Sequence, residues 1–316
     1  MLNRLTFLLG TGALLLCASL SAADLRLGII GTDTSHVIAF GGALNDPAAA
    51  DHLPGARITV AFKGDSPDVQ ESATRVEKFA AQLRDQFGVR LVDSIGALCG
   101  QVDGILLESV DGRAHLAQAK EAIRCGKPIF IDKPLGATLD DAREIARLAA
   151  AAGVPWFSAS SERYAGLKAL QSSPVKGAIV WGPGPYQDHM PLDLTWYGIH
   201  SAEALFALMG TGCAEVTRTA TEGADVVTCR WNDGRLGSIR LDRPSGKFGA
   251  LVFHPGNDSQ VLPAMDAGYV PLLKVILAFM NTRRPPVANA ETIEVFQFLD
   301  AAQRSKERGG APVQLR

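Results

Sequence analysis

Short apolar runs alternate with longer amphipathic stretches over the first half of the chain. In the stretch 74–87, Val76, Phe79, Leu83 and Phe87 recur at helical spacing, and Gly88 follows as a stop signal. The same criteria predict strands at 25–30, 58–62, 102–107, 128–131 and 154–158, and helices at 35–44, 74–87, 115–125 and 140–152. Strands that alternate with helices of this length indicate parallel βαβ units, so we expect a Rossmann-type, dinucleotide-binding domain over residues 24–160.

The second half of the chain has a different pattern. Predicted strands follow one another at 178–181, 215–221, 226–232, 235–241 and 248–253, with helices at 194–209, 270–281 and 290–308. Asn232-Asp233-Gly234, between two of these strands, is a strong hairpin signal. The predicted fold class is therefore α/β: a Rossmann-type parallel sheet, then an α+β substrate domain over residues 161–316 with a mostly antiparallel sheet and helices on one of its faces.

The first 23 residues have the pattern of a secretory signal peptide. Arg4 supplies a positive charge, residues 5–20 are apolar, and small residues end the segment at Ala22 and Ala23. The apolar run is shorter than the ~20 residues that span a bilayer. We therefore expect export by the general secretion path to the periplasm, and no membrane partner once residues 1–23 are removed.

Composition and net charge limit the classes of partner that we expect. The chain is 47% hydrophobic and 20% charged, with a net charge of -2. This balance gives no electrostatic reason to expect nucleic acid or an anionic membrane as a partner, so we expect a small-molecule substrate. The antiparallel sheet of the second domain offers a surface through which a homo-oligomer could form.

Four cysteines remain after the predicted signal peptide: Cys99, Cys125, Cys213 and Cys229. None of them forms a Cys-x-x-Cys pair, so we expect neither thioredoxin-type chemistry nor a zinc site, and no metal ligand is assigned. In an oxidising compartment four cysteines allow three pairings. For a chain of this length we expect buried, unpaired thiols instead.

The first candidate site lies between the first predicted strand and the first predicted helix, where the dinucleotide fingerprint Gly-x-Gly-x-x-Gly belongs. Counted from Gly31, Asp33 and His36 occupy the second and third glycine positions. A carboxylate beside a pyrophosphate is repulsive, by about 4 kcal/mol at ~4 Å near a surface. Either a dinucleotide binds in another way, or Asp33 and His36 have another task, or no dinucleotide binds. The residues assigned to cofactor binding here are Gly28, Gly31, Thr32, Asp33, Thr34, Ser35 and His36, and Thr34 or Ser35 could instead only cap the helix.

Two other positions follow strands of the first domain. Lys63 comes after the second strand and would suit the 2′-phosphate of NADP, although a solvated loop is the better interpretation. Glu108 comes after the strand 102–107, at the edge of the sheet where ligand contacts lie.

The strongest catalytic candidates lie at the end of the strand 128–131 and on the helix 194–209. Lys133, before Pro134, can stabilise an alkoxide or lower the pKa of a neighbour. His200 shares one helical face with Asp193 and Tyr197. Glu203 follows His200 by about one turn, and a carboxylate there would support the histidine in proton transfer.

These segments resemble the Gfo/Idh/MocA family of glucose–fructose oxidoreductase and inositol dehydrogenase. Asp132-Lys133-Pro134 matches its Glu-Lys-Pro or Asp-Lys-Pro, and Gly198, His200 and Glu203 match its Asp-x-Gly-x-His-x-x-Asp, with Glu in place of the last Asp and Trp196 in place of the first. The resemblance implies NAD or NADP as cofactor, a lysine near the nicotinamide, a cis bond before the proline and His200 as general acid/base. The signal segment and the substituted glycines indicate a divergent exported branch.

The leading hypothesis is an NAD(P)-dependent oxidoreductase of carbohydrate metabolism that acts on a sugar, a polyol or a related small hydroxy or keto compound. One alternative is a non-redox lyase, epimerase or hydrolase of a keto-sugar, which would use His200, Lys133, Asp33 and His36, with or without a metal. Another is a periplasmic carbohydrate-binding protein without catalysis. The substituted glycines favour the alternatives, whereas Lys133 and His200 favour an enzyme.

Overall fold

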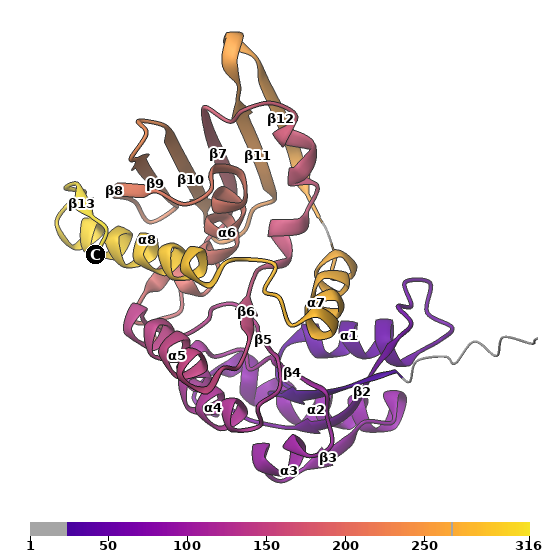
Figure 1. Ribbon diagram of the computed structural model, residues 1–316. Helices are drawn as coiled ribbons and strands as arrows, with labels where there is room; N and C mark the ends of the chain where they lie inside the picture. Colours follow the sequence, from indigo (N-terminus) through magenta and orange to yellow (C-terminus); the bar gives the residue numbers. More distant parts are fainter. Residues whose placement is uncertain (1–23, 267) are drawn as a thin grey trace, which may run out of the picture.

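The computed structural model describes residues 24–266 and 268–316, so the predicted signal peptide lies outside the described residues. The first sheet is parallel and has six strands in the order β3-β2-β1-β4-β5-β6, with the order reversing beside β1 (Figure 1). This order confirms the predicted Rossmann-type domain. The strands are β1 (Leu25–Ile30), β2 (Ala56–Phe62), β3 (Arg90–Val92), β4 (Gly104–Leu107), β5 (Ile129–Ile131) and β6 (Trp156–Ser158).

Helices cover both faces of this sheet. Gly88 and Gly153 adopt the left-handed conformation and end two of them, and Thr138 begins another with a reciprocal cap to Asp141. The apolar faces of α3, α4 and α5 pack on one side of the sheet, and that of α1 on the other, beside α2. The helices are α1 (Ser35–Asn45), α2 (Gln70–Phe87), α3 (Ile95–Cys99), α4 (Gly112–Arg124) and α5 (Leu139–Ala152).

The second sheet has seven strands in the order β12-β11-β7-β10-β9-β8-β13. Its neighbours are antiparallel except for β10 and β7, which confirms the predicted mostly antiparallel sheet. Helices α6 (Gly198–Met209) and α8 (Asn289–Glu307) pack against this sheet. The strands are β7 (Gly177–Pro183), β8 (Cys213–Ala220), β9 (Ala224–Trp231), β10 (Leu236–Asp242), β11 (Phe248–Phe253), β12 (Ser259–Met265) and β13 (Val313–Gln314).

Helix α7 (Val270–Thr282) leaves the second domain and packs on the first. It lies beside α1 in Figure 1, and Leu273, Ile276 and Phe279 are buried in the same apolar cluster as strands β1 and β5. The two domains are therefore linked by a shared core as well as by the chain. None of the helices in the described part of the chain is long and apolar enough to cross a membrane.

The secondary-structure prediction needs correction in two respects. The helix predicted from residue 194 begins only at Gly198, because Tyr197 leaves the helical conformation and a separate 3₁₀ turn forms at Asp193–Thr195. Strands β3, β12 and β13 and helix α3 were not predicted. Three of these four elements have five residues or fewer, too few for a periodic pattern.

The prediction of unpaired thiols is wrong. Cys99, at the end of α3, is bonded to Cys125, at the end of α4, and their Cα atoms are 4.9 Å apart. Cys213 and Cys229 are bonded across the neighbouring strands β8 and β9, with Cα atoms 5.9 Å apart. Both spacings suit a disulfide. The prediction rested on chain length, which says nothing about which cysteines meet. These pairs form because the fold brings residues 26 and 16 positions apart into contact.

Candidate active site

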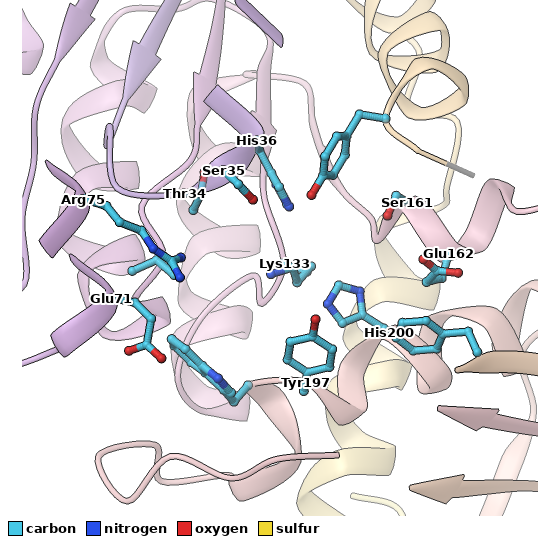
Figure 2. A pocket seen from close by; sticks show the side chains of 14 residues that line it. Thr34, Ser35, His36, Glu71, Arg75, Lys133, Ser161, Glu162, Tyr197 and His200 are labelled. Carbon is cyan, nitrogen blue, oxygen red and sulfur yellow. The ribbon is translucent and has the colours of Figure 1, made fainter. Parts of the chain in front are cut away.

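A pocket lies at the carboxyl ends of the first sheet, against α6 of the second domain. Its volume is about 330 Å³, which is within the range of small-molecule sites. Figure 2 shows side chains of both domains converging on it. Its walls are formed by Thr34, Ser35, His36, Glu71, Arg75, Val110, Lys133, Ser161, Glu162, Trp196, Tyr197, His200, Phe248 and Tyr269.

In the turn between β1 and α1, the first of the three glycine positions of the fingerprint is still a glycine, Gly31, and the backbone requires it there. Gly31 has φ of 89°, and a Cβ at this position would lie 2.4 Å from the backbone nitrogen of Ser109. Gly28 lies inside β1, where a Cβ would meet the Leu98 side chain at 2.8 Å, so its role is in packing. Thr32 is buried, and its hydroxyl donates to the Val76 carbonyl.

Asp33 does not point toward the place where a pyrophosphate would bind, so the expected repulsion is wrong. The carboxylate is fully buried, and its Oδ1 accepts a hydrogen bond from the Val110 amide at 2.9 Å. Asp33 therefore holds the loop after β4 instead of lining the pocket. Burial raises the pKa of this carboxyl above its usual range.

Helix α1 begins beside the pocket, and no side chain caps its N-terminal amides. Thr34 is the N-cap residue, but its side chain makes no capping hydrogen bond, so the predicted capping role is wrong. Arg75, on α2, lines the same pocket (Figure 2). A helix N-terminus and a guanidinium together form a site for a phosphate group.

His36, at the third glycine position, lies against two buried carboxylates. Its Nδ1 is 3.0 Å from Asp132 Oδ2 and 3.6 Å from Glu108 Oε2. The ring of Tyr269, at the start of α7, packs on the imidazole with a centroid distance of 4.6 Å. We call His36, Glu108 and Asp132 the acidic triad.

The members of the acidic triad have strongly altered pKa values. Burial disfavours a charged His36, but Asp132 and Glu108 outweigh it and raise the pKa of the imidazole to about 9. Burial raises the pKa of Glu108 to about 7. Burial also opposes the ionisation of Asp132, but His36 and Lys133 lower its pKa to about 2. Such shifts are typical of functional sites.

Lys133 projects from the end of β5 toward the centre of the pocket (Figure 2). The Lys133–Pro134 bond is cis, as the resemblance implies. The buried His115 holds this loop in place, because its ring nitrogens contact the carbonyls of Pro134 and Ser109 at 2.7 and 2.8 Å. Lys133 Nζ lies 3.8 Å from Asp132 Oδ2, so the lysine and the acidic triad share one electrostatic environment.

His200 faces Lys133 from the first turn of α6. Its Nδ1 contacts Ser160 Oγ at 2.7 Å, and the rings of Tyr197 and Phe248 pack against it. Burial and the nearby Lys133 lower the pKa of the imidazole well below its ordinary value. His200 is therefore neutral near pH 7 and can accept a proton.

Two residues predicted to assist His200 are engaged elsewhere. Glu203 accepts a hydrogen bond from Arg163 Nε at 2.6 Å, and the same guanidinium also contacts Glu291. Asp193 belongs to the separate 3₁₀ turn and accepts from Arg218 at 2.8 and 3.0 Å. Asp193 therefore does not share a helical face with His200, because Tyr197 interrupts the predicted helix.

Outside the pocket, Lys63 forms an exposed ion pair with Glu77, in agreement with a solvated loop. The residues that the sequence did not reveal include Arg75, Glu162 and Tyr269, which line the pocket, and Ser160, which contacts His200. Glu162 lies beside Ser161 (Figure 2), and burial raises its pKa to about 7. Each comes from a segment without a motif. Ser160 and Glu162 follow β6, Arg75 lies on α2 and Tyr269 precedes α7. Only these positions in the fold bring them to the carboxyl edge of the sheet.

The two sheets and the pocket at their junction define a two-domain α/β protein with a Rossmann-type first domain. Residues 25–160 match the model of an oxidoreductase family with an NAD-binding Rossmann fold. This description agrees with the predicted oxidoreductase and with its predicted nicotinamide cofactor. No sequence among the curated proteins matches this chain.

Solved structures share the whole architecture at low sequence identity. The myo-inositol dehydrogenase of Lactobacillus casei, in complex with NAD(H) and myo-inositol, is 16% identical with a TM-score of 0.72, over 93% of this chain and 97% of that one. The myo-inositol 2-dehydrogenase of Lactobacillus plantarum is 14% identical with a TM-score of 0.70, over 93% and 100% of the two chains. An oxidoreductase of Agrobacterium radiobacter, in complex with NAD+, L-tartaric acid and magnesium, is 14% identical with a TM-score of 0.67, over 93% and 99%. Identities this low establish the fold alone.

Proposed function

We propose that the protein is a nicotinamide-dependent oxidoreductase that acts on a small hydroxy or keto compound of the sugar or polyol type. The observation that carries this proposal is the meeting of Lys133 and His200, from different domains, in one pocket. The opposite wall of the pocket is the β1–α1 turn of the domain that matches the oxidoreductase family. The solved dehydrogenases with myo-inositol or L-tartaric acid bound support a substrate rich in hydroxyl groups.

The side chains in the pocket suit the proton transfer of an alcohol oxidation. In the tautomer that donates Nδ1–H to Ser160 Oγ, the Nε2 lone pair of His200 accepts the proton of the substrate hydroxyl. The Lys133 ammonium stabilises the developing alkoxide. In the reverse direction, His200 returns the proton to the carbonyl oxygen. Tyr197 packs on His200 and limits the orientations of the ring.

The β1–α1 turn fits the phosphate part of a dinucleotide. Gly31 permits the tight turn, the α1 amides have no side-chain cap, and Asp33 is directed inward. These amides and Arg75 would hold the pyrophosphate. When bound, the nicotinamide supplies the acceptor or donor of the hydride.

The proposal is tested by titration with NAD(H) and NADP(H), followed by a screen of sugars and polyols. We expect Arg75→Ala to weaken dinucleotide binding and Arg57→Ala, an exposed arginine on β2, to leave it unchanged. We expect His200→Ala to lower kcat by at least ~100-fold with little change in dinucleotide affinity, while His52→Ala, in a remote loop, is neutral. A protein that binds no dinucleotide at millimolar concentration would contradict the proposal and favour the non-redox alternative.

We also propose that the chain is an exported, divergent relative of this family, with residues 1–23 as its signal peptide. Two disulfides in the described residues support an oxidising compartment such as the periplasm. Cell fractionation and N-terminal sequencing of the mature protein test the assignment. A cytoplasmic protein with an intact N-terminus and reduced cysteines would contradict it.

The second sheet supports the proposed homo-oligomer. Large apolar side chains are exposed on five of its strands, and such patches are typical of interaction surfaces. They are Ile179, Val226, Leu236, Phe253 and Val261. We expect light scattering to give a dimer or larger assembly, and Val261→Glu with Phe253→Glu to shift it toward the monomer. A wild-type monomer at micromolar concentration would refute the assembly.

A further inference from the structure

Three ionisable side chains from different parts of the first domain meet at one wall of the pocket. His36 lies in the first turn of α1, Glu108 follows β4 directly, and Asp132 follows β5 directly. All three are at the carboxyl edge of the sheet. The carboxylates of Glu108 and Asp132 are 0% and 1% exposed, whereas His36 lines the pocket.

The acidic triad has buried polar atoms without hydrogen-bond partners. Both oxygens of Glu108, both oxygens of Asp132 and Nδ1 of His36 have no partner among the described residues. The close contact from His36 Nδ1 to Asp132 lacks the alignment of a hydrogen bond. Buried carboxylates are normally satisfied by donors or by metals, because an unpaired one is costly. The triad therefore lacks a partner that a ligand could supply.

The spacing of the donor atoms suits a common metal ion. Two donors about 2.1 Å from one ion are about 3.0 Å apart at right angles and about 3.4 Å apart in a tetrahedral site. The distances from His36 Nδ1 to Asp132 Oδ2 and Glu108 Oε2 are 3.0 and 3.6 Å. One donor atom from each of the three residues lies within 4.8 Å of the others. Only small side-chain movements would bring all three to bonding distance.

We propose that His36, Glu108 and Asp132 bind a divalent transition-metal ion, with Zn²⁺ and Mn²⁺ as the ions that fit an imidazole and two carboxylates. The imidazole disfavours Mg²⁺ and Ca²⁺, which prefer oxygen ligands. Three protein ligands leave at least one position open, as in catalytic metal sites. Because His36 lines the pocket, this position would receive a hydroxyl, carbonyl or carboxylate oxygen of a small ligand beside Lys133 and His200.

A metal ion at the acidic triad would be opposed by a neighbouring positive charge and would compete with a proton. Lys133 Nζ lies 3.8 Å from Asp132 Oδ2, and its positive charge opposes a cation. A proton on His36 is the competing occupant, but a single N–H leaves at least three carboxylate oxygens without a donor. Tyr269 packs on the imidazole and restricts its rotation, which preserves the geometry of Nδ1.

Calorimetric titration of the chelator-treated mature protein with ZnCl₂ and MnCl₂ tests the proposal, together with metal analysis of protein purified without chelator. We expect one ion per chain. Glu108→Gln and His36→Gln should each weaken binding by at least ~100-fold. Glu71→Gln is the matched control, since it removes a carboxylate from the same pocket without touching the triad, and it should bind as the wild type does. Circular dichroism confirms that each variant is folded.

Absence of binding at millimolar metal would overturn the proposal, as would binding that survives both triad substitutions. Metal binding is measured here without dinucleotide, so its outcome is independent of the proposed redox function. A protein that binds metal but no dinucleotide would retain the metal site and lose the redox function. The opposite result would retain the redox function and reduce the acidic triad to a charged support for Lys133.

Discussion

The two domains each bury a group of charged side chains, and the groups differ in how well they are bonded. In the second domain, Arg218 lies between Asp193 and Asp225, and all four carboxylate oxygens accept hydrogen bonds. Tyr186, Arg243 and Lys306 complete this arginine network. In the first domain, the acidic triad has no hydrogen-bonded carboxylate oxygen among the described residues.

The difference separates structural from functional charge. The arginine network is bonded internally and joins β8 to β9, to the 3₁₀ turn and to the end of α8, so it needs nothing from outside the fold. In the acidic triad, His36 lines a pocket, and the carboxylate oxygens have no hydrogen-bond partner among the described residues. Buried polar groups that remain unsatisfied raise the free energy of the folded protein, and such sites are retained where a ligand or a reaction uses them.

The largest effect should come from breaking the arginine network. Arg218→Ala removes the main partner of the buried Asp225 and of the half-buried Asp193, so we expect a loss of about 3–5 kcal/mol in the free energy of unfolding. Arg240→Ala is the control, because its pair with Asp242 is exposed; it should cost less than about 1 kcal/mol. Urea unfolding measures both. Equal losses would show that the network is no more than a surface ion pair.

The Cys213–Cys229 disulfide joins the same two strands as the arginine network. It closes a loop of 16 residues, so replacing both cysteines by serine should cost about 3 kcal/mol. Urea unfolding of the variant with and without dithiothreitol, beside the wild type, measures this. No difference between the oxidised variant and the wild type would mean that the hydrogen bonds of the sheet and the arginine network hold β8 to β9 without help from the disulfide.

The smallest effect on stability should come from the acidic triad. Glu108→Gln removes a buried carboxylate that has no hydrogen-bonded donor, so in chelator-treated protein we expect a change within about 1 kcal/mol, or a small stabilisation. Urea unfolding in chelator compared with saturating Zn²⁺ would then separate the wild type, which the metal stabilises, from the variant. A loss of several kcal/mol in chelator would place Glu108 among the structural charges.

The sequence predicted the elements that have a periodic pattern of their own. Strands β1, β2 and β9 and helices α1, α5 and α8 agree with their predicted ranges to within about two residues. The family resemblance, not topology, assigned Lys133 and His200 to one site, and both line the pocket. Local pattern and topology were sufficient for the elements themselves.

Partners far apart in the chain could not be predicted in the same way. Glu203 is at the correct helical spacing to support His200, yet it forms an ion pair with Arg163. The 3₁₀ turn after β6 brings this guanidinium to that side of α6. Asp33 is in the expected turn, but its direction depends on the Val110 amide. His36 meets Glu108 and Asp132 only after three strands have aligned. Such contacts follow from tertiary packing, which a single sequence does not reveal.

The most direct test of the contrast between the two charged groups is a crystal structure of the protein soaked in ZnCl₂, with data collected above and below the zinc absorption edge. We expect one strong anomalous peak about 2.0–2.2 Å from His36 Nδ1 and from an oxygen of Glu108 and of Asp132, and no peak at the arginine network. An empty acidic triad with hydrogen bonds closed among its own members would contradict this expectation.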